Sequence, residues 1–295
     1  MKVSKQLLPF LFRTLGQLPM PLMRGIGGCM GRFSHWQGNR MAQVTRRNIE
    51  RCFPQLDRSQ QQQLTKSSLQ ETGRLAGETF VVWSRSYTWL RRRILHIHGL
   101  DHAKQQLTMG KGLIVLAPHI GNWEVLGLFL AELGPVTSLY EPPKNAVVEQ
   151  LVRNARQGSG ATLVPTNRKG VVALFQALQN GHVTGILPDQ TPNEAGGRFS
   201  EFFGQPTFTM TLVHKLIQRT GCRAVYGYAR RVEGGWEIVF RPVPDALYSE
   251  DEQQSLRALN EGIEACVRDV PEQYQWEYKR FKRQPTDVNF YEGTQ

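Results

Sequence analysis

The chain of 295 residues is 40% hydrophobic, which is enough for one large domain with an ordinary core. Its four cysteines, Cys29, Cys52, Cys222 and Cys266, are widely separated and form no C-x-x-C pair, which argues against a disulfide framework and a zinc site. The net charge of +11 lies in residues 1–100, which hold 16 Lys and Arg against 4 Asp and Glu. This basic third favours an anionic lipid surface or an acidic protein as partner. Nucleic acid is excluded, because zinc-finger spacings and RNA-binding aromatic motifs are absent.

The amino-terminal segment mixes leucines with isolated basic side chains. Arg13 and Arg24 leave ten uncharged residues between them, whereas a membrane-spanning helix needs about 20 apolar residues. No small-residue cleavage site follows the apolar stretch 7–12, so a signal peptide is not expected either. Leucines at helical spacing predict a helix lying in a membrane interface, or alternatively a stripe that docks on the protein's own core. The leucines are Leu7, Leu8, Leu11, Leu15 and Leu18.

Two amphipathic helices are predicted next, over residues 39–53 and 58–82, and Pro54 ends the first of them. Residues 83–93 then mix tryptophan and tyrosine with arginine, which is typical of either a membrane edge or a solvated helix end. Helical patterns give way to strand patterns near residue 94. We therefore expect a basic, membrane-proximal helical region over 1–93 and an α/β domain over 94–295.

Short apolar runs alternate with helical patterns from residue 94 onward. This alternation predicts an α/β fold with a central, mostly parallel sheet flanked by helices. Since ligands bind beyond the carboxyl ends of strands in such sheets, polar residues that follow strands are the site candidates. The predicted strands are 94–98, 113–117, 136–140, 161–165, 183–187, 222–230 and 236–243, and the predicted helices are 123–133, 145–157, 169–180, 209–220 and 253–268.

The clearest functional signal lies at the junction of strand 113–117 and helix 123–133. His119 falls in the turn, and Glu124 falls in the first helical turn five residues later. Side chains five residues apart on one helix do not face each other. We expect the bend at Gly121 to let the Glu124 carboxylate reach the imidazole. An imidazole, with an unperturbed pKa of about 6.5, can take a proton from a hydroxyl when a carboxylate holds it in one tautomer. The alternative is a satisfied buried histidine beside a surface glutamate.

Two further polar sites follow the same logic. Asp189 comes directly after the apolar strand 183–187 and is expected to face the same crevice as His119. Arg156 lies near the end of helix 145–157, with Arg153 three residues earlier on the same face. A guanidinium there can hold a phosphate through two hydrogen bonds. An ion pair between domains is the alternative for both Arg156 and Asp189.

Two phrases near the carboxyl terminus complete the candidates. The glycine-bounded stretch 196–204 carries three phenylalanines, which suits the wall of an apolar groove, with Arg198 at a phosphate, or else a core-packing loop. A basic cluster near the end of the chain suits an acidic protein or phosphates, or else a solvated tail. The cluster consists of Lys279, Arg280, Lys282 and Arg283.

Four phrases in this order resemble one enzyme family. H-I-G-N-W-E at 119–124 resembles the H-x4-D/E box of lysophospholipid and glycerolipid acyltransferases, and G-N-W-E is closest to the lipid A late acyltransferases, the lauroyl and myristoyl transferases. N-I-E-R-C-F-P at 48–54, P-D-Q at 188–190 and P-E-Q-Y-Q-W-E-Y-K-R-F-K at 271–282 are similar to phrases of the same family. The resemblance covers nearly the whole chain.

The resemblance implies roles for individual residues. His119 is expected to be the general base and Glu124 the residue that orients it. Asp189 and Arg156, or Arg153 in place of Arg156, are expected to bind substrate, together with Asn122 and Arg198.

The resemblance also implies a reaction and a place in the cell. A fatty acyl group would pass from acyl carrier protein to the hydroxyl of a 3-hydroxyacyl chain on a lipid A precursor. This would occur at an anionic membrane surface, the cytoplasmic face of a bacterial inner membrane, to which the protein is peripherally or shallowly attached. No metal or other cofactor is expected besides the acyl carrier protein co-substrate. Two alternatives are an acyltransferase for another lysolipid or glycolipid, such as an ornithine lipid, and a non-catalytic membrane lipid-binding module.

Overall fold

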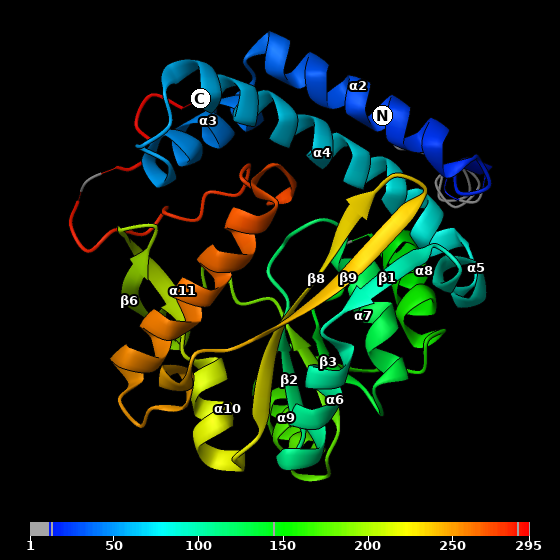
Figure 1. Cartoon of the computed structure of the whole chain (residues 1–295), viewed down its shortest axis with the longest axis vertical. Helices are drawn as coiled ribbons and strands as arrows, with labels where there is room; N and C mark the ends of the chain where they lie inside the picture. The colour runs from blue at the N-terminus through cyan, green and yellow to red at the C-terminus, as the bar shows by residue number, and fades with distance from the viewer. Residues whose placement is uncertain (1–11, 13, 144, 288, 295) are drawn as a thin grey trace.

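The computed structural model describes residues 12, 14–143, 145–287 and 289–294, and its centre is a five-stranded sheet (Figure 1). The strand order is β1-β9-β8-β2-β5, in which only the β8–β9 hairpin is antiparallel. The predicted α/β fold with a mostly parallel sheet is therefore confirmed. The strands are β1 (Ile94–His98), β2 (Leu113–Leu116), β5 (Val183–Ile186), β8 (Arg223–Val232) and β9 (Gly235–Pro242).

Two small sheets accompany the central one. Parallel strands β3 (Thr137–Tyr140) and β4 (Thr162–Pro165) form the first, and the hairpin β6 (Gly197–Phe202) and β7 (Gln205–Met210) forms the second. The hairpin lies where the sequence predicted a groove wall. Phe202 and Phe203 are buried there, and the Phe203 ring lies 5.1 Å from that of Phe53. The core-packing alternative is therefore correct for these phenylalanines.

The helices that precede the sheet in the sequence form a separate layer, and the later helices cover the sheet. We call the first four the helical layer: α2 (Met20–Gln37), α3 (Arg40–Cys52), α4 (Arg58–Ser84) and α5 (Tyr87–Arg91). In Figure 1, α2 is the outermost helix along the top, and α4 lies between it and the sheet. The later helices are α6 (Leu100–Met109), α7 (Trp123–Phe129), α8 (Ala146–Gln157), α9 (Arg168–Gln179), α10 (Leu212–Thr220) and α11 (Glu252–Asp269).

The structure describes only part of the amino-terminal segment. Half of the interfacial helix predicted around residues 7–18, namely residues 7–11 and 13, lies outside the described part. Among the helices that the structure does describe, none is both long enough and apolar enough to cross a bilayer.

Helices α2 and α4 touch through their backbones because glycines face one another. A Cβ added at Gly27 would lie 2.0 Å from the carbonyl oxygen of Gly73, and one at Gly31 would lie 2.0 Å from that of Leu69. Such distances are far inside van der Waals contact, so only glycine fits at these positions. The glycine face of α2 is thereby held against α4, and the opposite face is turned outward.

This packing gives a stability prediction. We expect Gly73→Ala to lower the free energy of unfolding by about 1–3 kcal/mol, because the new methyl group would collide with the carbonyl oxygen of Gly27. Gly25→Ala is the matched control, since a Cβ there meets no heavy atom within 4 Å. It should be neutral or raise stability by up to about 1 kcal/mol, the helix propensity difference. Urea unfolding followed by circular dichroism measures both variants, and equal effects would contradict the glycine contact.

Candidate active site

The turn between β2 and α7 is held rigidly by backbone hydrogen bonds. The Gly121 N–H donates to the carbonyl oxygen of Gln273 at 2.9 Å, and the Gln275 N–H donates to that of His119 at 3.0 Å. Gly121 has a φ of +60°, and a Cβ there would lie 2.1 Å from the carbonyl oxygen of Ala229 on β8. The turn is therefore wedged between β8 and the carboxyl-terminal segment, which fixes the position of the His119 side chain.

His119 is bound by Asp189 through both carboxylate oxygens. The ring Nδ1 lies 2.8 Å from Oδ1, and the backbone N–H of His119 donates to Oδ2 at 2.8 Å. Asp189 is 2% exposed. The two residues follow β2 and β5, which are adjacent parallel strands, so the carboxyl ends of these strands bring them together. The sequence placed Asp189 in this crevice but not as the partner of the imidazole.

The Asp189 pair determines which nitrogen of His119 is free to accept a proton. Burial would raise the pKa of the Asp189 carboxyl, but the charge of His119 and the hydrogen bonds from it lower that pKa below its usual value. An ionised Asp189 favours the tautomer with the proton on Nδ1 of the ring. Nε2 then keeps its lone pair, and the Gln190 amide nitrogen lies 3.1 Å from it. The Trp123 ring meets the imidazole edge-on at 4.7 Å between centroids.

Glu124 pairs with Arg156, not with His119. Arg156 donates from Nη2 to Oε1 at 2.6 Å and from Nε to Oε2 at 3.1 Å. This is the bidentate geometry of a strong guanidinium–carboxylate pair. The contact predicted between the Glu124 carboxylate and the imidazole is therefore wrong, because the ring nitrogens pair with Asp189 and Gln190. The first turn of α7 carries Glu124 around to the side that faces α8, where Arg156 lies.

Two cavities open on either side of Trp123. Glu124 and Arg156 lie on an otherwise mostly apolar cavity of about 80 Å³. His119 lines a smaller one of about 10 Å³, and Trp123 lines both. The apolar lining of the larger cavity suits hydrocarbon, and its two charged groups lie at one side. Its apolar side chains include Leu126, Leu128, Leu130, Leu139 and Leu163.

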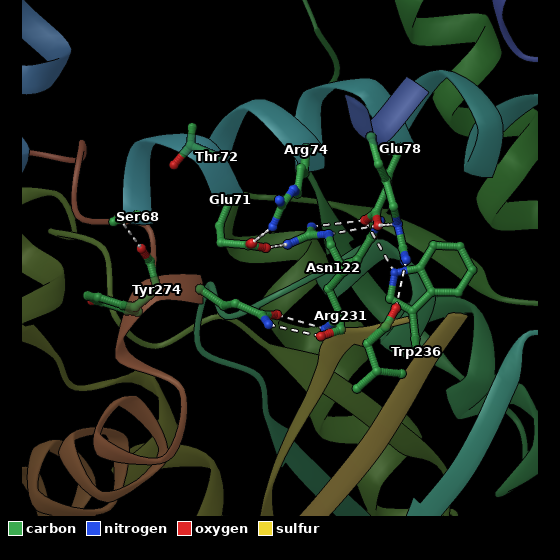
Figure 2. A network of polar contacts seen from close by, with 12 residues as sticks. Ser68, Glu71, Thr72, Arg74, Glu78, Asn122, Arg231, Trp236 and Tyr274 are labelled. Atoms are coloured by element: carbon green, nitrogen blue, oxygen red, sulfur yellow. Dashed lines mark hydrogen bonds and ion pairs between the residues drawn. The ribbon is translucent and has the colours of Figure 1, made fainter. Parts of the chain in front are cut away.

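Asn122 holds the start of α7 in place rather than facing a cavity. Its side chain accepts from the Val125 N–H at 3.3 Å as the helix cap, and its amide donates to Glu78 at 2.8 Å. Glu78 is fully buried and also binds Arg231 at 2.7 Å and Arg24 at 2.5 Å (Figure 2). This buried charge network joins α2, α4 and β8 to the amino terminus of α7. Asn122 is therefore a positioning residue, which corrects its predicted contact with substrate.

Arg153 and Arg198 each pair with a carboxylate other than Asp189. Arg153 binds Glu149 on its own helix at 2.6 Å, so Arg156 is the arginine that joins the site. The Arg198 side chain is 71% exposed on β6 and pairs with Glu252 at 3.0 Å, and its place at a substrate phosphate stays a prediction.

The basic cluster near the carboxyl terminus includes one buried member. Arg280 is only 3% exposed and donates to the carbonyl oxygen of Phe208 at 2.8 Å, so it is not available to a carrier protein. Burial lowers the pKa of its guanidinium group.

Sequence reasoning missed Gln190 and Glu78. Gln190 follows Asp189 directly in the P-D-Q phrase, and that adjacency was the available signal. Glu78 lies inside a helix whose pattern gave no indication that its carboxylate is buried.

Comparison with known proteins adds the final observation. Over residues 5–283 the chain matches the family described as bacterial lipid A biosynthesis acyltransferase. A lipid A biosynthesis palmitoleoyltransferase of Escherichia coli (strain K12) is 26% identical over 277 residues, 91% of this chain and 88% of the relative. A lauroyltransferase of the same organism is 24% identical over 278 residues, with coverages of 92% and 89%. A phosphatidylinositol mannoside acyltransferase of Mycobacterium tuberculosis (strain CDC 1551 / Oshkosh) is 27% identical over 184 residues, with coverages of 61% and 58%.

Proposed function

The chain belongs to the bacterial lipid A biosynthesis acyltransferase family, and we propose that it moves a fatty acyl group from acyl carrier protein to the hydroxyl of a 3-hydroxyacyl chain on a lipid A precursor. The observation that carries the chemistry is the His119–Asp189 pair, whose imidazole contacts Trp123, a residue that also lines the apolar cavity. A carboxylate-braced imidazole is the side chain that enzymes use most often to take a proton from an alcohol.

His119 is the general base in this proposal. Its Nε2 accepts the proton of the lipid hydroxyl. In the complex, this hydroxyl replaces the Gln190 amide as the group beside Nε2. The ionised Asp189 keeps the other ring proton on Nδ1 and stabilises the imidazolium that forms. Asp189 thus takes over the orienting role that the sequence had assigned to Glu124.

The alkoxide oxygen then attacks the carbonyl carbon of the thioester. The tetrahedral intermediate expels the pantetheine thiolate of the carrier, and the proton held by His119 passes to that sulfur. The product is an ester and a free carrier thiol, so the atoms balance. Because a thiol has a pKa of about 8.5, its thiolate leaves without assistance from a metal ion. We therefore assign no metal or organic cofactor to the reaction.

Arg156 and Glu124 act as positioning residues at the apolar cavity. Glu124 uses two hydrogen bonds to fix the guanidinium plane, and Nη1 of Arg156 is the donor directed to an anionic group of the substrate. The cavity of about 80 Å³ suits the carbonyl end of an acyl chain rather than its whole length. We place the reaction at the cytoplasmic face of the inner membrane, where acyl carrier protein and the lipid precursor meet.

The proposal is tested by acyl transfer with purified components. The protein is incubated with acyl carrier protein charged with a 12- to 16-carbon chain, and a lipid A precursor is analysed by mass spectrometry. A gain of one acyl mass supports the proposal, and a coenzyme A thioester in place of the carrier protein tests the donor. Binding of the lipid without any acyl gain would favour a non-catalytic lipid-binding module.

A glycolipid acceptor is the second candidate. It is favoured by the similarity to the phosphatidylinositol mannoside acyltransferase. Running the same assay with a mannosylated or ornithine lipid separates the two acceptors. Faster transfer to either of these lipids than to the lipid A precursor would replace the proposed acceptor.

A further inference from the structure

The outer face of α2 exposes a continuous apolar stripe. Among the described residues, nine large apolar side chains are exposed, and five of them lie on this one helix. The stripe recurs at helical spacing along the whole length of α2, and its most exposed member, Trp36, is 78% accessible. Stripes of this extent on a soluble surface mark an interaction site. We call it the α2 stripe: Leu22, Ile26, Met30, Phe33 and Trp36.

The α2 stripe cannot turn inward to cover itself. The opposite face of the helix carries Gly27 and Gly31. A Cβ at either position would lie 2.0 Å from a backbone oxygen of α4. Rolling the helix would drive large side chains into that backbone contact. The apolar face is therefore held outward by the packing, and Figure 1 shows α2 on the outer edge of the molecule.

The charge around the α2 stripe is basic. Helix α2 contains no acidic residue and carries the exposed Arg32, whereas its Arg24 is bound to the buried Glu78. Residues 1–100 hold 16 Lys and Arg against 4 Asp and Glu. A surface cavity of about 880 Å³ adjoins the amino terminus of α2, and its charged lining includes Arg74, Arg85 and Arg93 together with Glu71 and Glu233. At the other end of the stripe, the rings of Phe33 and Trp36 lie 5.7 Å apart. An apolar face edged by arginines and ending in aromatics matches the interface of an anionic bilayer.

We propose that the α2 stripe is a membrane-docking surface that lies flat in the interface of an anionic bilayer. The apolar side chains enter the headgroup–acyl boundary, while the surrounding arginines face lipid phosphates. A second copy of the chain is a poorer occupant, because two such basic surfaces would repel each other. This surface would bring the site to its lipid substrate. The inference rests on the proposed function in one respect only, namely that an enzyme acting on a lipid must reach a membrane.

Vesicle flotation of the full chain tests the docking surface. The vesicles contain phosphatidylethanolamine and phosphatidylglycerol, with pure phosphatidylcholine vesicles for comparison. We expect Met30→Asp/Trp36→Asp to lower the partition coefficient at least about tenfold, since two charges replace two apolar groups that enter the bilayer interface. The matched control is Met109→Asp/Val172→Asp, which changes two comparably exposed apolar residues on α6 and α9 and should partition like the unchanged chain. We expect the unchanged chain and both double variants to bind the anionic vesicles better than the phosphatidylcholine vesicles.

A probe on Cys29, an exposed residue of α2 next to Met30, gives an independent readout of the α2 stripe. Cys29 is exposed, whereas Cys52, Cys222 and Cys266 are buried, so a thiol-directed environment-sensitive fluorophore labels it selectively. Its emission is expected to shift to the blue when anionic vesicles are added. The same fluorophore on Val172→Cys in a Cys29→Ser background should not respond, because Val172 lies on α9, which Figure 1 shows at the opposite end of the molecule from α2.

Three outcomes would overturn the docking surface. The first is flotation of Met30→Asp/Trp36→Asp equal to that of the unchanged chain. The second is a lipid-free dimer that this variant converts to a monomer while vesicle binding is kept, which would assign the stripe to a second copy. The third is equal binding to phosphatidylcholine vesicles, which would remove the anionic partner. Flotation is measured without acyl donor, so failure of acyl transfer leaves this result independent.

Discussion

His119→Ala is expected to lower the rate of acyl transfer by a factor of about 10² to 10⁴, the contribution of a positioned general base. The substitution removes the imidazole that pairs with Asp189 and Gln190 at this edge of the sheet. Folding should be preserved, because the turn is fixed by backbone hydrogen bonds that the variant keeps. Single-turnover transfer from acyl carrier protein, with circular dichroism as a check of folding, measures the effect.

The matched control uses another imidazole–carboxylate pair on the same chain. His98 Nε2 lies 3.3 Å from Glu237, but its side chain is 50% exposed and lies on the edge strand β1. We expect His98→Ala to transfer acyl groups at the unchanged rate. Equal loss in the two variants, or near-normal transfer by His119→Ala, would refute the assignment of the base.

Glu78→Ala is expected to lower the free energy of unfolding by about 3–5 kcal/mol, the typical effect of removing one partner of a buried ion pair. The carboxylate is fully buried and accepts hydrogen bonds from Arg24, Arg231 and the amide of Asn122. Without it, two guanidinium groups would be left in the interior with less than their countercharge. Glu261→Ala, on a surface pair with Arg257, is the control and should leave stability almost unchanged.

Acid titration provides a second readout of Glu78. Burial would raise the pKa of this carboxyl, but Arg231 and Arg24 outweigh burial and lower it. The unfolded chain therefore binds more protons, and the stabilisation is complete above the unfolded pKa of about 4.3. It is lost as the pH falls through the lower pKa of the folded state. Glu78→Gln should weaken this acid sensitivity, and an unchanged pH profile would contradict the ionised, paired carboxylate.

Local patterns located most strands and helices. The apolar run 113–117 and its parallel neighbour at 183–187 lie within one residue of β2 and β5, because each strand is buried on both faces and its sequence records that burial. The hairpin of β6 and β7 was missed, since its glycines and a proline read as a loop. The helix predicted from residue 209 begins at Leu212, because residues 205–210 pair with β6 instead.

Helix α2 shows where local propensity fails. It contains four glycines and begins beside two prolines, so local propensity does not predict a helix over residues 20–37. The structure explains two of them, Gly27 and Gly31, by their contact with the backbone of α4. Only a second helix 40 residues away makes this composition favourable, and single-sequence patterns do not report such a partner.

The partner of His119 could not be chosen from spacing. Glu124 is five residues away and Asp189 is 70 residues away, so proximity in sequence pointed to the wrong carboxylate. The strand order decides the outcome, because β2 and β5 are adjacent and place the residues after them side by side. The sequence pattern correctly assigned both His119 and Asp189 to strand ends. The hydrogen bonds between them could be predicted only with the strand order of the sheet.

The decisive measurement is a side-by-side comparison of single-turnover acyl transfer by Asp189→Asn and Glu124→Gln. An asparagine cannot accept from both the ring and the backbone N–H of His119, so we expect Asp189→Asn to slow the chemical step about 10²-fold or more. Glu124→Gln keeps a hydrogen bond to Arg156 and should mainly weaken substrate binding. If Glu124→Gln instead lost the chemical step while Asp189→Asn retained it, Asp189 would not be the residue that braces the catalytic imidazole.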